Sequence, residues 1–298
     1  MAVVDASALP KKPVEREREA CRALEEGHIL LFPETPFELA AAEREFLLRS
    51  RQTEAGYHKN IAYRPAADRL TGVARQNPED GRRLRDLLRA YSRRAVAFAA
   101  GWMPRYAAKW RIDYASFRPQ EEAGRRLSTH ARNDLLHVDS FPTRPTHGDR
   151  IFRVFTNVNP AAPRVWRTGE TFPELAERFA VSSGILSNVT RPRVARRVLS
   201  AARAAGFPVA VRPAYDEFMH RFHNFLKEND AYQESARAEQ IQFPPGSTWM
   251  VFTDAVTHSV LSGQYALEQT LLIARDSLLF PELSPIAVLE RLAGRAMA

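Results

Sequence analysis

Two histidines and one aspartate are the residues of this sequence whose types and spacing best suit metal chemistry. His137 and Asp139 are separated by one residue in the stretch LLHVDS, and His258 follows far downstream. On a β-strand, successive side chains point to opposite faces, so His137 and Asp139 would project to the same side. Two imidazoles and one carboxylate on one face of an iron, with open positions opposite, are typical of non-heme Fe(II) oxygenases. A co-substrate and O2 would bind at the open positions.

Other histidine arrangements compete for the same role. His147 and Asp149 form a second H-x-D pair, but the surrounding prolines and the central glycine argue against strand geometry. His220 and His223 lie three residues apart, which puts both on one face of a helix, and a solvated face is the commoner explanation. An isolated H-x-D pair is also more often hydrogen-bonded than metal-binding. These alternatives stay open on the residues alone.

His258 belongs to a predicted strand–turn–strand unit. A Pro-Pro-Gly turn precedes its apolar strand, and a Ser-Gly turn separates that strand from a second one over 267–275. Arg275 ends the second strand and would enter the metal pocket, where it would fix the far carboxylate of a dicarboxylic co-substrate. Strand parity puts Arg275 on the same face as Gln269, Leu271 and Ile273.

The remaining pattern is mixed α and β. Helical periodicity predicts helices over 13–26, 40–51, 79–102 and 286–294. Alternating or apolar runs predict strands over 28–33, 112–117 and 150–159, and β structure from 241 to 279. Residues 160–240 depart from the β pattern, with helices at 193–205 and 216–228, and are interpreted as a helical insertion that caps the metal site. The stretch 57–64 (YHKNIAYR) carries a tyrosine–histidine–lysine cluster that would face a substrate.

Length and composition favour a globular protein. The chain has 298 residues, 45% of them hydrophobic, which is enough to bury a substantial core. We expect a disordered tail over 1–12 and a single domain over 13–298. A single cysteine, Cys21, and a start without an apolar signal segment predict a reducing compartment such as the bacterial cytoplasm. No apolar run approaches the roughly 20 residues that span a bilayer, so any membrane contact is expected to be peripheral.

The charge balance predicts an anionic partner. The formal net charge is +8, and arginines carry most of the excess. Guanidinium groups donate two parallel hydrogen bonds to carboxylates and phosphates, and Arg132, Arg144 and Arg150 near the metal segment are the candidates for substrate contact. Because no nucleic-acid-binding motif accompanies the charge, nucleic acid is not the expected partner.

Two longer stretches carry a family resemblance. RNDLLHVDSFPTRPTHGDRIFRVFTNVNP and PPGSTWMVFTDAVTHSVLSGQY resemble the 3-deoxy-D-manno-oct-2-ulosonic acid (Kdo) hydroxylases, a family of Fe(II)/2-oxoglutarate-dependent dioxygenases. The resemblance covers roughly residues 20–285. It implies an α+β fold with a double-stranded β-helix (jelly-roll, cupin-like) core, braced by the N-terminal helices.

The resemblance also implies a reaction. Fe(II) would bind His137, Asp139 and His258, and 2-oxoglutarate would place its far carboxylate on Arg275, with Asn157 as a weaker candidate for holding it. With O2, the enzyme would hydroxylate C3 of Kdo in the inner core of lipid A and release succinate and CO2. The substrate would be a Kdo-bearing lipid A precursor, met at the cytoplasmic face of the bacterial inner membrane.

Two other functions stay open. The first is an Fe(II)/2-oxoglutarate oxygenase of another anionic substrate, such as an amino acid or a protein side chain. The second is a β-helix protein that binds a metal or sugar acid without turnover. The basic surface favours a lipid-linked substrate, and a purely structural metal site tends to be closed.

Overall fold

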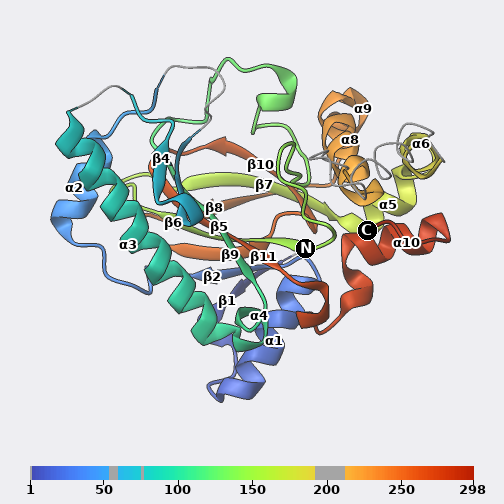
Figure 1. Cartoon of the computed structure of the whole chain (residues 1–298), viewed down its shortest axis with the longest axis horizontal. Helices are drawn as coiled ribbons and strands as arrows, with labels where there is room; N and C mark the ends of the chain where they lie inside the picture. The colour runs from blue at the N-terminus through green and yellow to red at the C-terminus, as the bar shows by residue number, and fades with distance from the viewer. Residues whose placement is uncertain (1, 54–59, 75–76, 192–211) are drawn as a thin grey trace, which may run out of the picture.

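The computed structural model describes residues 2–53, 60–74, 77–191 and 212–298 (Figure 1). Its helices are α1 (Pro13–Glu25), α2 (Ala41–Arg49), α3 (Pro78–Trp102), α4 (Pro104–Ala107), α5 (Phe172–Phe179), α6 (Ile185–Thr190), α8 (Ala214–Glu228), α9 (Asp230–Ser235) and α10 (Pro285–Ala293). Its strands are β1 (Val3–Asp5), β2 (Ile29–Phe32), β3 (Ile61–Arg64), β4 (Arg69–Thr71), β5 (Arg111–Arg118), β6 (Arg150–Asn157), β7 (Arg164–Thr171), β8 (Glu239–Phe243), β9 (Thr248–Phe252), β10 (Val256–Ser262) and β11 (Ala266–Ile273). Within this part of the chain, no helix is long and apolar enough to cross a membrane.

The strands form two sheets packed face to face. The larger sheet has the order β1-β2-β9-β6-β11-β5-β3-β4, and the smaller one has the order β10-β7-β8. Aromatic side chains fill the space between them: the ring of Trp166 on β7 lies 5.0 Å from Phe155 and 5.6 Å from Trp249, measured between ring centroids. The predicted α+β fold with a jelly-roll core is confirmed.

Helix α3 covers the outer face of the larger sheet. Its Leu88 and Tyr91 share one buried cluster with Val154 of β6 and Leu271 of β11, and the Tyr91 hydroxyl donates to the Val154 carbonyl at 3.3 Å. Because side chains alternate along a strand, the residues next to Val154 and Leu271 point to the other face, between the two sheets. The helix layer therefore decides which strand residues can line a site inside the sandwich.

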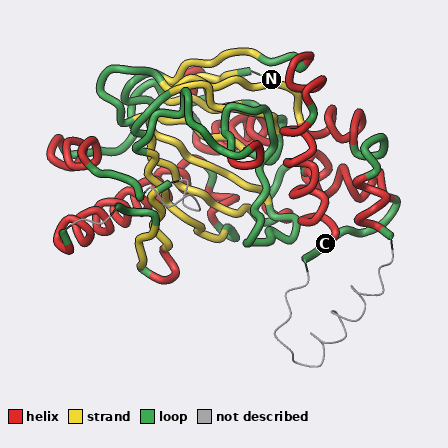
Figure 2. The backbone as a smooth tube through the Cα atoms, turned by 90° about the horizontal axis from the view of Figure 1, so that it is seen from above, coloured by secondary structure: helices red, strands yellow, loops and turns green. Residues whose placement is uncertain are grey.

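A second group of helices gathers at one end of the sheets (Figures 1 and 2). Helices α5, α6, α8 and α10 share a buried cluster that includes Leu136 and Val138. Leu136 and Val138 alternate with His137 and Asp139 along the extended backbone, so these polar side chains point away from the apolar cluster that buries Leu136 and Val138. Burial of two apolar side chains thus fixes the direction of both predicted ligands.

The segment that carries His137 and Asp139 is extended, but the prediction that it is a strand is wrong. It forms one isolated bridge with β10, in which the backbone N–H groups of His137 and His258 donate to each other's carbonyls at 3.1 and 3.0 Å. The Gln233 side chain of α9, in place of a neighbouring strand, satisfies both backbone groups of Leu136 at 2.9 Å. The side chains of His137 and Asp139 therefore still point to the same side, although the segment is not part of a β-sheet.

Two further predictions about the chain's layout are wrong. Residues 2–12 are not a disordered tail, because β1 pairs in parallel with β2 and Ala6 is buried in the core. The insertion does not begin at residue 160, because β7 is the central strand of the smaller sheet. The helical part lies within 172–235, where α8 confirms the helix predicted over 216–228; the helix predicted over 193–205 lies outside the described residues.

Arg150 holds the start of β6 to the turn before β10. Its side chain is fully buried, its Nε lies 3.1 Å from Oδ2 of Asp254, and its guanidinium stacks 4.2 Å from the centre of the Phe252 ring. The prediction that Arg150 contacts substrate is therefore wrong: no surface of this side chain is accessible.

We expect Arg150→Met to lower the free energy of unfolding by about 3 kcal/mol at pH 7, because loss of one partner leaves a buried charge uncompensated. Burial already raises the pKa of Asp254, and loss of Arg150 should raise it further. A carboxyl group with a raised folded-state pKa destabilises the protein when it is ionised, so the loss should shrink as the pH falls towards that pKa. Urea unfolding at pH 5 and pH 7 measures both effects.

Arg111→Met, which removes an exposed ion pair, is the control and should change the free energy of unfolding by no more than about 0.5 kcal/mol. An equal loss in both variants would contradict this account.

Candidate metal centre

His137, Asp139 and His258 meet between the two sheets. One ligand atom from each lies within 4.8 Å of the others. His137 Nε2 is 3.7 Å from Asp139 Oδ1, and His258 Nε2 is 3.9 Å from Asp139 Oδ2. Both imidazoles are about 95% buried, with exposed fractions of 5% and 6%. The structure thus brings the three predicted residues together, and their role as metal ligands stays a prediction.

Each imidazole is held by its own chain through the nitrogen that faces away from the site. Nδ1 of His137 lies 2.7 Å from the Leu135 carbonyl, and Nδ1 of His258 lies 3.1 Å from the Val256 carbonyl. A carbonyl oxygen only accepts hydrogen bonds, so Nδ1 carries the proton in both rings. This leaves a lone pair on each Nε2, directed toward the carboxylate of Asp139, which is the tautomer that metal binding requires.

Burial and neighbouring charges set the protonation of the site. Burial lowers the pKa of His137 well below its usual value, and the charge of Lys227 lowers it further. Burial also lowers the pKa of His258, although Asp139 raises it in part. Burial raises the pKa of Asp139, but the charge of Arg153, the nearby His258 and His223 and a hydrogen bond with Thr253 together outweigh it and leave that pKa below its ordinary value. At neutral pH, two neutral imidazoles and one ionised carboxylate face each other.

This donor set fits a divalent metal of the Fe(II) type. Two imidazole nitrogens and one carboxylate on one side leave the remaining positions of the metal open, as in the facial triads of non-heme iron proteins. Neighbouring rings also pack against both imidazoles. Trp166 stacks on His258 with 5.3 Å between ring centroids, and His223 meets His137 edge to face with 4.8 Å between ring centroids. The three donors are therefore preorganised.

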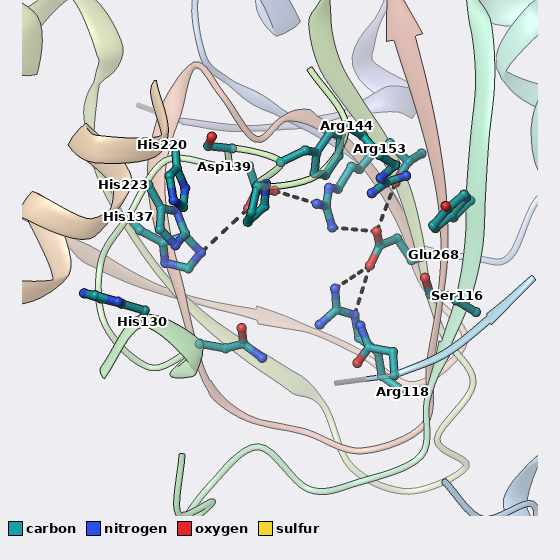
Figure 3. A pocket seen from close by; sticks show the side chains of 18 of the residues that line it. Ser116, Arg118, His130, His137, Asp139, Arg144, Arg153, His220, His223 and Glu268 are labelled. Carbon is teal, nitrogen blue, oxygen red and sulfur yellow. Dashed lines mark hydrogen bonds and ion pairs between the residues drawn. The ribbon is translucent and has the colours of Figure 1, made fainter. Parts of the chain in front are cut away.

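His137 and Asp139 form part of the wall of a cavity of about 510 Å³. Figure 3 shows histidines on one side and arginines on the other. The histidine side comes from α8 and the short helical turn Thr129–Ala131, with His130, His220 and His223. The opposite side comes from the inner face of the larger sheet, where Arg118, Arg153 and Glu268 lie on β5, β6 and β11.

A chain of ion pairs connects the metal-side carboxylate to the sheet. Arg153 lies 2.9 Å from Asp139 Oδ2 and 2.5 Å from Glu268 Oε1. Glu268 Oε2 lies 2.5 Å from Arg118. Burial raises the pKa of Glu268, but the two guanidinium groups outweigh it and lower that pKa below its usual value. Two cations thus share the Glu268 carboxylate beside the triad.

The predicted co-substrate residues lie elsewhere. β11 ends at Ile273, and Arg275 lies in the helical turn Arg275–Ser277, where its half-exposed side chain pairs with Glu290 at 2.8 Å. The predicted placement of Arg275 in the pocket is wrong, because Leu271 and Ile273 on its strand face pack in the helix-covered core. Asn157 also lies outside the pocket: it is buried, and its amide donates to the carbonyls of Ala162 and Phe243 at 3.1 and 3.0 Å.

The predicted substrate arginines separate into three environments. Arg144 lines the cavity. Arg132 does not line it and instead pairs with Asp134 at 2.6 Å. Arg150 is fully buried, as described above. Proximity in sequence to His137 did not distinguish these environments, because the chain bends at 142–144 and turns at His147 and Gly148 before β6.

The competing histidine motifs also have definite positions. His147 and Gly148 have positive φ angles of 58° and 93°, so the second H-x-D pair turns back on itself, and no strand face joins His147 to Asp149. The interpretation of His220 and His223 as a solvated helix face is wrong, because both line the cavity. Tyr57, His58 and Lys59 of the stretch 57–64 lie outside the described residues, whereas Arg64 of that stretch lines the cavity.

The sequence analysis assigned no role to Arg118, Arg153 or Glu268. A signal was available: each is a charged residue within a strand, and Glu268 interrupts an otherwise largely apolar run, ALEQTLLI. A charge on a buried strand requires a partner. Three such charges on neighbouring strands indicate a polar site between the sheets.

Comparisons with known proteins agree with this geometry. A family model described as 3-deoxy-D-manno-oct-2-ulosonic acid (Kdo) hydroxylase matches residues 9–296. The solved structure of the Kdo hydroxylase KdoO, a non-heme Fe(II) α-ketoglutarate-dependent dioxygenase, with α-ketoglutarate and Fe(III) is 34% identical to this chain. That match covers 100% of this chain and 98% of that chain, with a TM-score of 0.83.

Two further KdoO structures are similar. The cobalt(II) complex is 35% identical over 99% of this chain and 97% of that chain, with a TM-score of 0.84. The complex with succinate and Fe(III) is 35% identical over 99% and 97%, with a TM-score of 0.82. No curated protein sequence matches the chain.

We expect His137→Gln and His258→Gln each to weaken Fe(II) binding by more than about 100-fold, which exceeds the effect of losing an outer-shell partner of a metal ligand. Anaerobic titration with Fe(II), and with Co(II) as a spectroscopic probe, measures this affinity. His147→Gln is the matched control, because it makes the same substitution at the second H-x-D pair and should leave the affinity unchanged. Wild-type affinity in His258→Gln would rule out the triad.

Proposed function

The chain belongs to the Kdo hydroxylase family of non-heme Fe(II)/2-oxoglutarate-dependent dioxygenases, and from this membership we propose that it hydroxylates C3 of Kdo in a lipid A precursor. The products would be the 3-hydroxylated sugar, succinate and CO2. The observation that carries the proposal is the buried cluster of His137, Asp139 and His258 in a chain that the family model matches over residues 9–296. We treat 13–298, together with β1, which pairs with β2, as one catalytic domain, because residues from β3 to β11 line a common cavity.

The residues around the cluster suit the proposed cofactors. Fe(II) on His137, Asp139 and His258, with 2-oxoglutarate and O2, supplies the oxidising chemistry that inserts oxygen into a C–H bond. The protein holds the donors in the required tautomer and buries both histidines. Ionisation of Asp139 beside Arg153 keeps the carboxylate available to a cation.

We assign the far carboxylate of 2-oxoglutarate to Arg153 and Arg118 in place of Arg275. Both guanidinium groups contact Glu268, and Arg153 is shared with Asp139. When a divalent metal neutralises Asp139, Arg153 is left with Glu268, which it shares with Arg118. The second carboxylate near Arg118, that of Glu122 at 3.8 Å, is itself shared with Arg125 and Arg164, so positive charge is in excess. Burial of an unpaired charge is unfavourable, so this part of the cavity favours one further anion, and a bidentate carboxylate matches the guanidinium geometry.

The charge of the protein supports a lipid-linked substrate. The net charge of +8 and the arginines on the sheet side of the cavity suit an acidic sugar at an anionic bilayer. Each Lys or Arg near such a surface contributes about 1 kcal/mol of attraction. We therefore propose peripheral contact with the cytoplasmic face of the bacterial inner membrane.

The decisive test is turnover with a defined lipid. The protein is loaded anaerobically with Fe(II) and 2-oxoglutarate and then exposed to air with Kdo-bearing lipid A, while mass spectrometry follows the lipid and an enzymatic assay follows succinate. We expect one oxygen atom gained on the sugar for each succinate formed. Succinate without a modified lipid would keep the oxygenase and reject the Kdo substrate. Absence of both iron binding and succinate would favour a non-catalytic β-helix protein.

The co-substrate assignment has its own prediction. Arg153→Gln should raise the KM for 2-oxoglutarate by about 10- to 100-fold, the range for loss of a charge-assisted hydrogen bond. Arg275→Gln removes the same charge from a residue that pairs with Glu290 outside the cavity and should leave this KM unchanged. Steady-state succinate formation measures both variants. The reverse pattern would return the anchor to Arg275.

A further inference from the structure

An irregularity in β5 builds a second cationic cluster at the rim of the cavity. Gln269 of β11 pairs with Ala115, but Leu271 pairs with Ile112, so β5 contains an extra residue at this point. A β-bulge of this kind redirects side chains and is common beside functional sites. Here two consecutive residues of β5, Asp113 and Tyr114, both contact Arg144 at the rim of the cavity.

Both residues hold Arg144, which follows the metal segment in the chain. Asp113 forms an ion pair with Arg144, and the Arg144 guanidinium lies 3.9 Å from the centre of the Tyr114 ring and 4.2 Å from that of Phe141. Phe141 also lies 5.7 Å from the guanidinium of Arg153. The rim cluster therefore adjoins the arginine beside Asp139.

Arg64 completes the cluster from the neighbouring strand. Its guanidinium lies 5.0 Å from the centre of the Tyr114 ring, and the residue lines the cavity. Its Nε is buried without a hydrogen-bond partner, and Arg64 forms no ion pair within the ranges that the structure describes. The two arginines carry two positive charges against the single negative charge of Asp113, so one positive charge at this rim lacks a counterion.

We propose that Arg64, Tyr114 and Arg144 form a subsite for a carboxylate of the sugar-acid substrate. This subsite rests on the function proposed above and adds the residues that distinguish an acidic sugar from a neutral one. One uncompensated charge matches one carboxylate, and two guanidinium groups beside a phenol hydroxyl supply the donors that a carboxylate accepts.

The position of the cluster favours a sugar carboxylate over a lipid phosphate. In Kdo, the carboxylate carbon is only two bonds from C3, so a group that binds it must lie inside the same cavity as His137 and Asp139. Arg144 meets this condition because it shares Phe141 with Arg153. The phosphates of lipid A belong to a different sugar and would be expected outside a cavity of about 510 Å³.

The test compares Kdo-bearing lipid A with its methyl ester, in which the carboxylate charge is removed, and with the dephosphorylated lipid. For the wild type, esterification should raise the KM of the lipid about tenfold or more. Arg64→Gln should raise the KM for the acid to a similar extent and should lose most of the difference between acid and ester. Arg64→Lys, which keeps the charge, should recover part of it. Dephosphorylation should affect the wild type and Arg64→Gln equally.

Arg18→Gln is the matched control, because Arg18 is exposed on α1 and its replacement should leave every KM unchanged. Equal urea-unfolding midpoints of wild type and Arg64→Gln would exclude a folding defect.

If the wild type hydroxylates the lipid but Arg64→Gln distinguishes acid from ester as the wild type does, the subsite is wrong and the proposed function stands. If instead the phosphate contrast collapses in Arg64→Gln, the cluster binds phosphate. A wild type that modifies no lipid overturns both proposals.

Discussion

A buried carboxylate between two imidazoles requires positive charge beside it, and much of this structure supplies that charge. Asp139 contacts Arg153 at 2.9 Å, and Arg153 in turn contacts Glu268. Glu268 then pairs with Arg118 at 2.5 Å. Arg153, Glu268 and Arg118 occupy the adjacent strands β6, β11 and β5, so the two ion pairs of Glu268 also connect these strands. Loss of one member leaves its neighbour buried and unpaired, which makes the set behave as a unit.

The sequence was sufficient to predict which residues of β11 share a face, but it did not show which of the two faces lines the cavity. The sequence analysis grouped Gln269, Leu271 and Ile273 on one face of their strand, and the structure has Leu271 and Ile273 together in the core under α3. The cavity takes the alternate residues, Glu268 and Thr270. Parity follows from the geometry of one strand, whereas the face that a helix covers depends on residues far away in the sequence. The sequence analysis assigned the pocket to the wrong face of this strand and therefore chose Arg275.

Burial of individual polar residues also required the tertiary structure. Arg150 and Arg144 are six residues apart and chemically identical, yet one is fully buried with Asp254 and the other lines the cavity. His220 and His223 have the spacing of an exposed helix face, but α8 turns that face toward the metal site. The local motif at His137 and Asp139 was readable because two-residue spacing and the surrounding stretch carry their own geometry. Long-range contacts decided the rest.

The protein itself holds the side chains of the candidate metal ligands in place. Backbone carbonyls hold both Nδ1 atoms, and Trp166 stacks on His258. Preorganised donors lose little entropy when they bind a metal. The helix α8 faces these donors with histidines, whereas the strands opposite supply arginines. On the function proposed above, this separation of the two residue types would orient an acidic ligand, with its carboxylate on the sheet side and its reacting carbon toward His137 and Asp139.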